Sequence, residues 1–338
     1  MRIRFKFLCI FFILLPAINY AQDVTKQIDN LRYYANLITL ESADFQKYAA
    51  NERFRLELKT IFDSKKSKSF PFDSVKNISV LTAPDKKFKI ITWVLPKENA
   101  TYEYYGFILF TKKTSSSKKY VPLTDNTDKI NSPENAVIDC KNWYGAVYYK
   151  MILTRYQGKK HYTLLGWKGN NNMTTKKVIE VLQFRSSGVP SFGAPLFRKY
   201  KDKPTRIIFE YSSRSSMLLR YDKQMIHTII KAAHTKPGKY NPKDINSGKA
   251  LKSDKKYQAK DKITKSNMIV FDRLSPIDNR TSKYAANLEG QYQFYAPESN
   301  IMDAFIFANG KWIYTKDVDA RNPKTKQTKA NKSPKPSK

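Results

Sequence analysis

Beyond Pro71 the chain consists of short runs in which apolar, β-branched and aromatic residues alternate with polar ones. This period of two places successive side chains on opposite faces of a strand, and turn residues separate the runs. Because the connections are short, neighbouring strands are expected to pair antiparallel. The pattern predicts a mainly β fold, an antiparallel meander of about 14 strands. The predicted strands are Ile78–Thr82, Phe88–Leu95, Tyr104–Thr111, Tyr120–Leu123, Ala146–Arg155, His161–Trp167, Lys177–Phe184, Phe192–Phe197, Arg206–Ser212, Met217–Tyr221, Met268–Leu274, Gln291–Tyr295, Phe305–Phe307 and Trp312–Thr315.

Three connections have the residues of tight hairpin turns, namely Pro84–Lys87, Gln157–Lys160 and Ala308–Lys311. The strands fall into groups of about four, which favours a propeller-like arrangement of blades stacked around an axis. The groups lack a fixed period or a shared signature. A sandwich or an open barrel is therefore the alternative prediction.

A helical hairpin is predicted before the β domain. Val24 to Leu40 carries apolar residues at the spacing of one helical face, and a second helix is expected to end near Asp63. Ser42 is the predicted N-cap of this second helix. Residues 22–66 are assigned to the hairpin and a linker, and residues 67–320 to the β domain, against which the hairpin is expected to pack.

The first 21 residues read as a cleavable signal peptide. Arg2, Arg4 and Lys6 precede an apolar run that ends before Pro16, and Ala21 is a small residue at the expected cleavage point. A membrane-spanning helix needs about 20 apolar residues, so this run predicts no anchor after cleavage. Cys9 lies inside the run without a small residue after it, so no lipid attachment is expected. The predicted location is periplasmic or extracellular.

The chain is strongly basic. Its formal charge is +33, and loss of Arg2, Arg4 and Lys6 leaves +30. The surplus concentrates in a Lys-rich insertion at residues 231–266 and a tail at 321–338, both predicted to be disordered because they contain too few apolar residues to form a core. These segments predict adhesion to an anionic envelope surface. The expected surface-binding residues are Lys255, Lys256, Lys324, Lys326, Lys329 and Lys332.

Familiar catalytic motifs are missing from the sequence. Only His161 lies in the region expected to fold, which argues against a zinc site, and no phosphate-binding loop, dinucleotide turn or nucleophile elbow occurs. Cys140 is interpreted as a small buried side chain. Ser115 with Lys118, and Ser253 with Lys256, are treated as chance pairs in polar loops. No cofactor, metal or catalytic residue is predicted.

Paired carboxylates are the exception, because glycosidase acids come from distant strands and leave no local motif. The acidic residues that lie near predicted strands are Asp139, Glu210, Asp222, Asp272 and Glu289. Most such acids are solvated or paired with lysines. They nevertheless keep a carboxylate-dependent polysaccharide hydrolase open as the alternative function.

Aromatic residues give the stronger indication of binding. Rings cluster with side-chain amides in several segments, a mixture that stacks on sugar faces or peptides, although core packing explains many of them. The candidate ligand-binding residues are Trp143, Tyr144, Trp167, Tyr292 and Tyr295. Trp143 and Tyr144 are expected to be exposed, because they precede Gly145 in a turn.

Several strings taken together resemble a family of uncharacterised exported proteins of the Bacteroidota. They are Leu81 to Phe88, Asn142 to Gly145, Tyr162 to Trp167, Phe209 to Ser212 and Ile269 to Asp272. The resemblance extends from the leader to about Asn322 and implies an envelope setting, with no activity or cofactor. The Lys-rich insertion and the tail are longer than in the usual form of that family.

These observations favour a non-catalytic exported envelope protein whose folded part binds a glycan or another envelope protein. Its basic segments are expected to hold it to an anionic surface. Nucleic acid is not an expected partner, because export removes the protein from the cytoplasm and the tail lacks interleaved arginines and aromatic residues.

Overall fold

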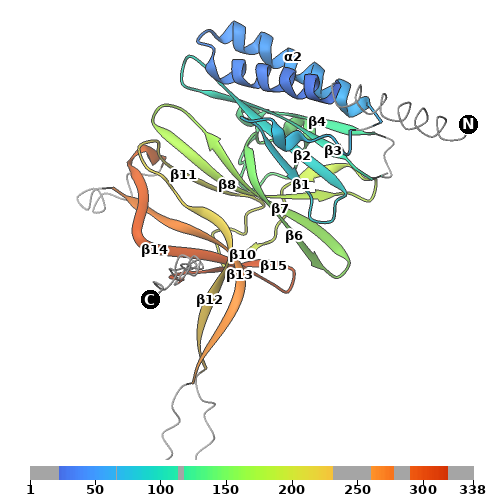
Figure 1. Ribbon diagram of the computed structural model, residues 1–338. Helices are drawn as coiled ribbons and strands as arrows, with labels where there is room; N and C mark the ends of the chain where they lie inside the picture. Colours follow the sequence, from blue (N-terminus) through green and yellow to red (C-terminus); the bar gives the residue numbers. More distant parts are fainter. Residues whose placement is uncertain (1–22, 66, 113–117, 231–259, 278–289, 319–338) are drawn as a thin grey trace, which may run out of the picture.

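The computed structural model describes residues 23–65, 67–112, 118–230, 260–277 and 290–318. These residues form a layer of two helices and three β-sheets that stack face to face (Figure 1). We call the sheets first, middle and last in chain order. The helices and the last sheet lie at opposite ends of the stack, and none of the described sheets closes on itself. The prediction of a mainly β fold with an N-terminal helical hairpin is confirmed.

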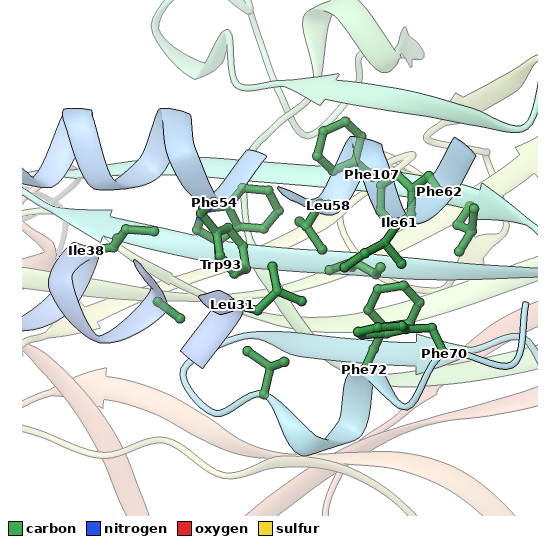
Figure 2. Close-up of a cluster of buried hydrophobic side chains, with 14 of the residues drawn as sticks. Leu31, Ile38, Phe54, Leu58, Ile61, Phe62, Phe70, Phe72, Trp93 and Phe107 are labelled. Carbon is green, nitrogen blue, oxygen red and sulfur yellow. The ribbon is translucent and has the colours of Figure 1, made fainter. Parts of the chain in front are cut away.

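The two helices, residues 23–40 and α2 (Asp44–Asp63), lie side by side over the first sheet. Their buried faces carry apolar residues that pack against Trp93 and Phe107 of the sheet (Figure 2). Trp93 also donates a hydrogen bond from Nε1 to Oδ1 of Asn51, at 2.8 Å. The helical period found in the sequence therefore marks the face that is buried.

The prediction that Ser42 caps α2 is wrong. Ala43 occupies the N-cap position, and its side chain makes no hydrogen bond to the helix. Glu98, in the turn after β2, instead accepts a hydrogen bond from the Asp44 N–H at 2.7 Å. The Glu98 N–H in turn donates to Asp44 Oδ1 at 2.9 Å. A long-range contact thus satisfies a backbone group that a helix start leaves without a partner.

The first sheet is a four-stranded antiparallel meander. Its strands are β1 (Ser79–Thr82), β2 (Phe88–Pro96), β3 (Tyr102–Phe110) and β4 (Tyr120–Thr124). Alternation sends Ile91 and Trp93 toward the helices, and Phe88 and Ile90 toward the middle sheet. Both faces of this sheet are covered, which explains why β2 is buried along most of its length.

The middle sheet has six strands among the described residues, and two of them share one edge of β8. The strands are β5 (Ile138–Asp139), β6 (Val147–Tyr156), β7 (Lys159–Gly169), β8 (Thr174–Phe184), β9 (Pro190–Phe192) and β11 (Ile207–Ser212). β11 pairs with the first half of β8, and β9 with its end. β11 is therefore an edge strand next to the last sheet.

The last sheet has the order β10-β15-β14-β13-β12, with only the β10–β15 pair parallel. The strands are β10 (Phe197–Arg198), β12 (Leu219–Ile230), β13 (Lys260–Pro276), β14 (Tyr295–Ala308) and β15 (Lys311–Thr315). Phe271 and Phe305 pack against Ile179 and Phe209 of the middle sheet. β12 and β13, the strands on either side of the Lys-rich insertion, pair antiparallel.

Several predicted strands differ from the structure, and β14 (Tyr295–Ala308), for example, is much longer than the predicted Phe305–Phe307. Phe192–Phe197 is broken by Gly193, which has a φ of +94° and lies in close contact with the Ala136 carbonyl. Most of Gln291–Tyr295 is the 3₁₀ helix η6 (Tyr292–Phe294), and the short β5 was not predicted. β13 begins at Lys260, so the last part of the predicted insertion 231–266 is strand.

The remaining irregular elements are the 3₁₀ helices η1 (Phe72–Ser74), η2 (Thr127–Lys129) and η3 (Cys140–Asn142). The predicted signal peptide and the tail at 321–338 lie outside the described residues, as do residues 231–259. Within the described part of the chain, no helix has the length and apolar character needed to cross a membrane.

Candidate binding site

The expectation that Trp143 and Tyr144 are exposed is wrong. They are 0% and 2% exposed, respectively. Gly145 allows this burial, because a Cβ atom at Gly145 would lie 2.5 Å from Tyr104 Cβ and 2.6 Å from Asp125 Cγ. The glycine therefore permits close packing in the core instead of marking an exposed turn.

Trp143 belongs to a buried polar network. Its Nε1 donates to the Tyr148 hydroxyl at 2.8 Å, and that hydroxyl donates to Glu180. Arg206 forms an ion pair with Glu180, and both side chains are 0% exposed. Arg206 also donates to the Pro133 carbonyl and stacks over the Tyr144 ring, 5.3 Å from its centroid. A buried charge pair requires such partners, so the network fixes this part of the middle sheet.

A pocket of about 530 Å³ opens beside this network, between the edge strand β11 and the last sheet. Many aromatic rings line the pocket. Some belong to strands of the middle and last sheets, and others to η6 and to the segments that connect the strands. These rings are Tyr144, Tyr200, Phe209, Phe271, Tyr292, Tyr295 and Tyr314. Tyr292 is 39% exposed and lies 6.1 Å from the Tyr295 ring, centroid to centroid. Three of the five predicted ligand-binding residues, Tyr144, Tyr292 and Tyr295, therefore line one pocket.

Two of the predicted acids, Glu210 and Asp272, line the same pocket. Glu210 accepts hydrogen bonds from Thr174 Oγ1 at 2.7 Å and Asn170 Nδ2 at 3.1 Å. It also forms an ion pair with Lys176 at 3.1 Å. Both of its oxygens are engaged, so Glu210 is held as a fixed carboxylate.

Asp272 is in a different state from Glu210. Its Oδ2 accepts a hydrogen bond from the Leu218 N–H at 2.7 Å. Burial raises the pKa of Asp272, and the Leu218 hydrogen bond and Arg220 offset this only in part. Asp272 is therefore protonated more easily than an aspartate in water.

Sequence reasoning missed a third acid, Asp303. It accepts hydrogen bonds from Arg273 Nε at 3.1 Å and from the Tyr314 hydroxyl at 2.6 Å. Burial alone would raise the pKa of Asp303, but the hydrogen bonds from Arg273 and Tyr314 outweigh it and lower that pKa. Arg273 lies two residues beyond Phe271, the register partner of Asp303, at the point where the β13–β14 register is interrupted between Asp272 and Leu274. The sequence did contain a signal for this residue, because Asp303 is an acidic residue between Met302 and Ala304 in an otherwise apolar run.

The other predicted residues lie elsewhere. Trp167 is half-buried, edge-on to the Tyr102 ring at 5.6 Å. Asp139 caps η3, and Asp222 pairs with Arg220 at 3.4 Å. Burial, with a contribution from Asp139, raises the pKa of the Cys140 thiol to about 12, so it stays protonated.

Several candidates fall outside the described residues. They are Ser115, Ser253, Glu289, Lys255, Lys256, Lys324, Lys326, Lys329 and Lys332. In the parts of the chain that the structure describes, no group of three or more His, Cys, Asp or Glu side chains is placed to hold a metal ion.

A second pocket, of about 770 Å³, lies between β3 and the turn after β7. Its notable side chain is Lys168, whose pKa burial lowers to about 8. Lys168 Nζ donates to Thr127 Oγ1 at 2.9 Å and to the Gly145 carbonyl at 2.7 Å, and lies 4.3 Å from the centre of the Tyr104 ring. These contacts tie η2 to the middle sheet and account for the lysine structurally.

Comparisons with known proteins give no relative. No family model matches the sequence, no curated protein is significantly similar to it, and no solved structure matches the fold. The pocket must therefore be interpreted from its own residues.

Proposed function

We propose that the protein is a non-catalytic, exported envelope protein that binds a glycan in the pocket between β11 and the last sheet. The observation that carries this proposal is the convergence, in one concave site, of aromatic rings with carboxylates and cations that are already fixed by their own contacts. Ring faces pack against the apolar faces of sugars, and fixed charged groups exchange hydrogen bonds with hydroxyl groups.

The size and charge of the pocket support a small polar ligand. Its volume of about 530 Å³ lies within the usual range of small-molecule sites. Lys176 is neutralised by Glu210, and Arg273 by Asp303, so the lining offers paired charges to the ligand. Such a surface suits a neutral polyhydroxylated molecule, because neither sign of charge prevails.

Binding is favoured over catalysis by the state of the acids. Both oxygens of Glu210 are engaged, and Asp303 is held by Arg273 and Tyr314. A general base needs a free lone pair directed at a water or a substrate. The proposal also includes export of the protein and its adhesion to an anionic surface through Lys255, Lys256 and the tail lysines. The sequence alone supports these two parts.

A glycan panel tests the proposal. Oligosaccharides of glucose, N-acetylglucosamine, xylose and galacturonic acid would be titrated against the mature protein by calorimetry. Tyr292→Ala should weaken binding about tenfold, or ~1.4 kcal/mol, because it removes an exposed ring at the pocket edge. Tyr33→Ala is the matched control, since Tyr33 is 60% exposed on the first helix, far from the pocket. Equal loss in both variants, or no binding by any sugar, would refute the proposal.

A polysaccharide hydrolase is the second candidate, and one observation favours it. Asp272, with its raised pKa, lines the same pocket as Glu210, which is held by Thr174, Asn170 and Lys176. Two carboxyl groups in different surroundings serve as acid and base in glycosidases. Turnover of any polysaccharide that disappears in both Glu210→Gln and Asp272→Asn would support it. Turnover that survives either substitution would exclude this pair.

A further inference from the structure

The β1–β2 and β3–β4 connections lie at one end of the first sheet, because its four strands form an antiparallel meander. Hydrogen bonds join the two connections. The Thr111 N–H donates to the Lys87 carbonyl at 3.0 Å, and Thr111 Oγ1 donates to the Lys86 carbonyl at 2.7 Å. α2 also ends here, since Lys119 Nζ donates to the Asp63 carbonyl at 2.7 Å.

Turns of the middle and last sheets reach the same end of the molecule. Lys160, after the β6–β7 turn, forms an ion pair with Asp85 of the β1–β2 turn at 3.0 Å. The β6–β7 turn also contacts the β14–β15 turn, because a Cβ atom at Gly310 would lie 2.5 Å from Tyr156 Cδ1. These contacts lock turns of all three sheets together.

Lysine concentrates at this end. The first helix begins here too, because it runs antiparallel beside α2 (Figure 1). Within the described residues of the four segments that surround this end of the first sheet, eight lysines, all exposed, stand against three acids. The segments, which we call the cationic end, are residues 23–26, 63–68, 83–87 and 111–119.

The opposite end of the first sheet has a different charge balance. Asp44, at the start of α2, exchanges hydrogen bonds there with Glu98 of the β2–β3 turn. The segments that surround this opposite end contain three lysines and five acids, and they are residues 41–44, 76–78, 97–101 and 125–129. The lysine surplus of the chain is therefore placed unevenly by the fold.

The glycan pocket lies away from the cationic end. β7 runs from the cationic end to Gly169, whose carbonyl accepts a hydrogen bond from the Tyr104 hydroxyl near the start of β3, at 3.0 Å. β8 therefore begins at the opposite end, and β11 pairs with the first half of β8. A partner bound at the cationic end leaves the pocket beside β11 open.

We infer that the cationic end docks the protein onto an anionic lipid bilayer, with the glycan pocket turned away from the membrane. This inference deepens, and rests on, the adhesion to an anionic surface proposed above. Exposed ammonium groups on several neighbouring connections can approach one surface together, and each is attracted by anionic headgroups. The locked turns hold them in place before binding, which lowers the entropic cost.

The composition of the cationic end favours a bilayer over nucleic acid. Its four segments contain no arginine and no aromatic residue. Proteins that bind single-stranded nucleic acid combine cations with aromatic rings that stack on the bases. Lysine alone supplies flexible point charges, which suit the mobile headgroups of a lipid surface.

Vesicle binding tests the inference. The mature protein would be titrated with vesicles of phosphatidylglycerol and phosphatidylcholine in equal parts, and with phosphatidylcholine vesicles, at constant ionic strength. One variant removes four exposed lysines of the cationic end that come from three of its segments. Its substitutions are Lys65→Gln, Lys87→Gln, Lys112→Gln and Lys118→Gln.

Two further variants lose the same charge elsewhere. The control variant changes exposed lysines outside the cationic end, namely Lys76→Gln, Lys129→Gln, Lys150→Gln and Lys223→Gln. The tail variant carries Lys324→Gln, Lys326→Gln, Lys329→Gln and Lys332→Gln. The variant of the cationic end should bind phosphatidylglycerol vesicles about a hundredfold more weakly, and the control variant less than about threefold more weakly.

The outcomes separate this inference from the adhesion on which it rests. Equal weakening in the cationic-end and control variants would show attraction by net charge alone and overturn the inference. Weakening in the tail variant only would also overturn it, and would leave adhesion through the tail standing. Equal binding of the unaltered protein to both kinds of vesicle would reject both. Tighter binding to duplex DNA than to vesicles, lost in the cationic-end variant, would reject the lipid assignment.

A fluorescent label tests the orientation on the bilayer. Cys140 is buried, so a cysteine introduced at an exposed position is the one that reacts with a dye. Lys112→Cys and Lys129→Cys would carry an environment-sensitive dye at the cationic and the opposite end, respectively. Phosphatidylglycerol vesicles should shift the emission at position 112 and leave that at position 129 unchanged. Equal shifts at both positions would contradict docking through the cationic end.

Discussion

At the scale of single residues, the chain buries charge only where several partners meet it. Glu180 and Arg206 are fully buried, and Tyr148 and the Pro133 carbonyl bind the groups that their ion pair leaves open. Removing both charges from water costs nearly as much free energy as their attraction returns, so such a pair adds little net stability. Loss of one partner is costly, because the other charge is left buried and unpaired. The value of the pair lies in fixing the position of Arg206, which lines the pocket.

Glu180→Ala should therefore lower the free energy of unfolding by about 3 to 5 kcal/mol, because Arg206 is left as an uncompensated buried charge. Urea denaturation of both proteins measures the difference. Glu180→Leu combined with Arg206→Met should recover much of the loss. A double variant that is less stable than Glu180→Ala would contradict this explanation.

The lowered pKa of Asp303 predicts how the stability of the protein depends on pH. Its folded pKa is lowered, so its contribution to stability is present above the unfolded value of about 3.9 and is lost as pH falls through the folded pKa. Asp303→Asn should cost about 1.5 to 3 kcal/mol at pH 7, since charge-assisted hydrogen bonds from Arg273 and Tyr314 are lost. The gap between the two unfolding curves should close in acid; a constant gap would disprove the assignment.

Asp272 should behave in the opposite way. Its pKa is raised, so any stability it contributes lies below the unfolded value and is lost as pH rises through the folded pKa. Asp272→Asn should leave the unfolding free energy at pH 7 unchanged or increased, while it weakens glycan binding. Denaturation and calorimetry on one preparation check both effects. A clear loss of stability at pH 7 would mean that Asp272 is a structural residue.

At the scale of elements, the alternation of side chains predicted most strands because burial on one or both faces imposes it. The prediction failed where another constraint set the backbone. Gly193 breaks a run of apolar residues through its positive φ. In Gln291–Tyr295 the alternating rings of Tyr292 and Phe294 are both exposed, so no buried face supports a strand there.

The two hairpin glycines form a matched pair for a further prediction. Gly158 and Gly310 both have a φ of +75°, but a Cβ atom at Gly158 would meet nothing within 4 Å. Gly158→Ala should cost about 1 to 2 kcal/mol through backbone strain alone. Gly310→Ala should cost about 1 to 3 kcal/mol more, through collision with Tyr156.

A double-mutant cycle with Tyr156→Ala measures this collision. In the Tyr156→Ala background the cost of Gly310→Ala should fall to that of Gly158→Ala. An unchanged cost would show that the two turns are not locked together as the structure indicates. Thermal unfolding in one buffer is sufficient for the comparison.

At the scale of the whole molecule, the sequence predicted the mainly β fold and its N-terminal helical hairpin better than the site. Tyr292, Tyr295, Glu210 and Asp272 were identified as single candidates, because ring clusters and acids near strands are visible locally. Their assembly was not predictable, since it depends on how β11 approaches the last sheet. Asp303 was missed because its role depends on contacts with Arg273 and Tyr314, which come from two other strands.

The basic insertion can be tested at this scale. Ile230 and Lys260 are register partners at the end of the β12–β13 ladder, so a two-residue Asn-Gly turn should replace residues 231–259 without disturbing the fold. The replacement removes eight lysines, and it should weaken salt-sensitive binding to anionic vesicles. Unaltered vesicle binding by a chain that lacks both this segment and residues 321–338 would rule out adhesion by the basic segments.

The central claim is that the pocket between β11 and the last sheet holds a sugar. The most direct measurement is a crystal structure of the mature protein with the oligosaccharide that binds best in the calorimetric panel. We predict a sugar ring against Tyr292 or Tyr295, with hydroxyl groups near Asp272 and Arg273. A sugar bound elsewhere, with this pocket empty, would contradict the account.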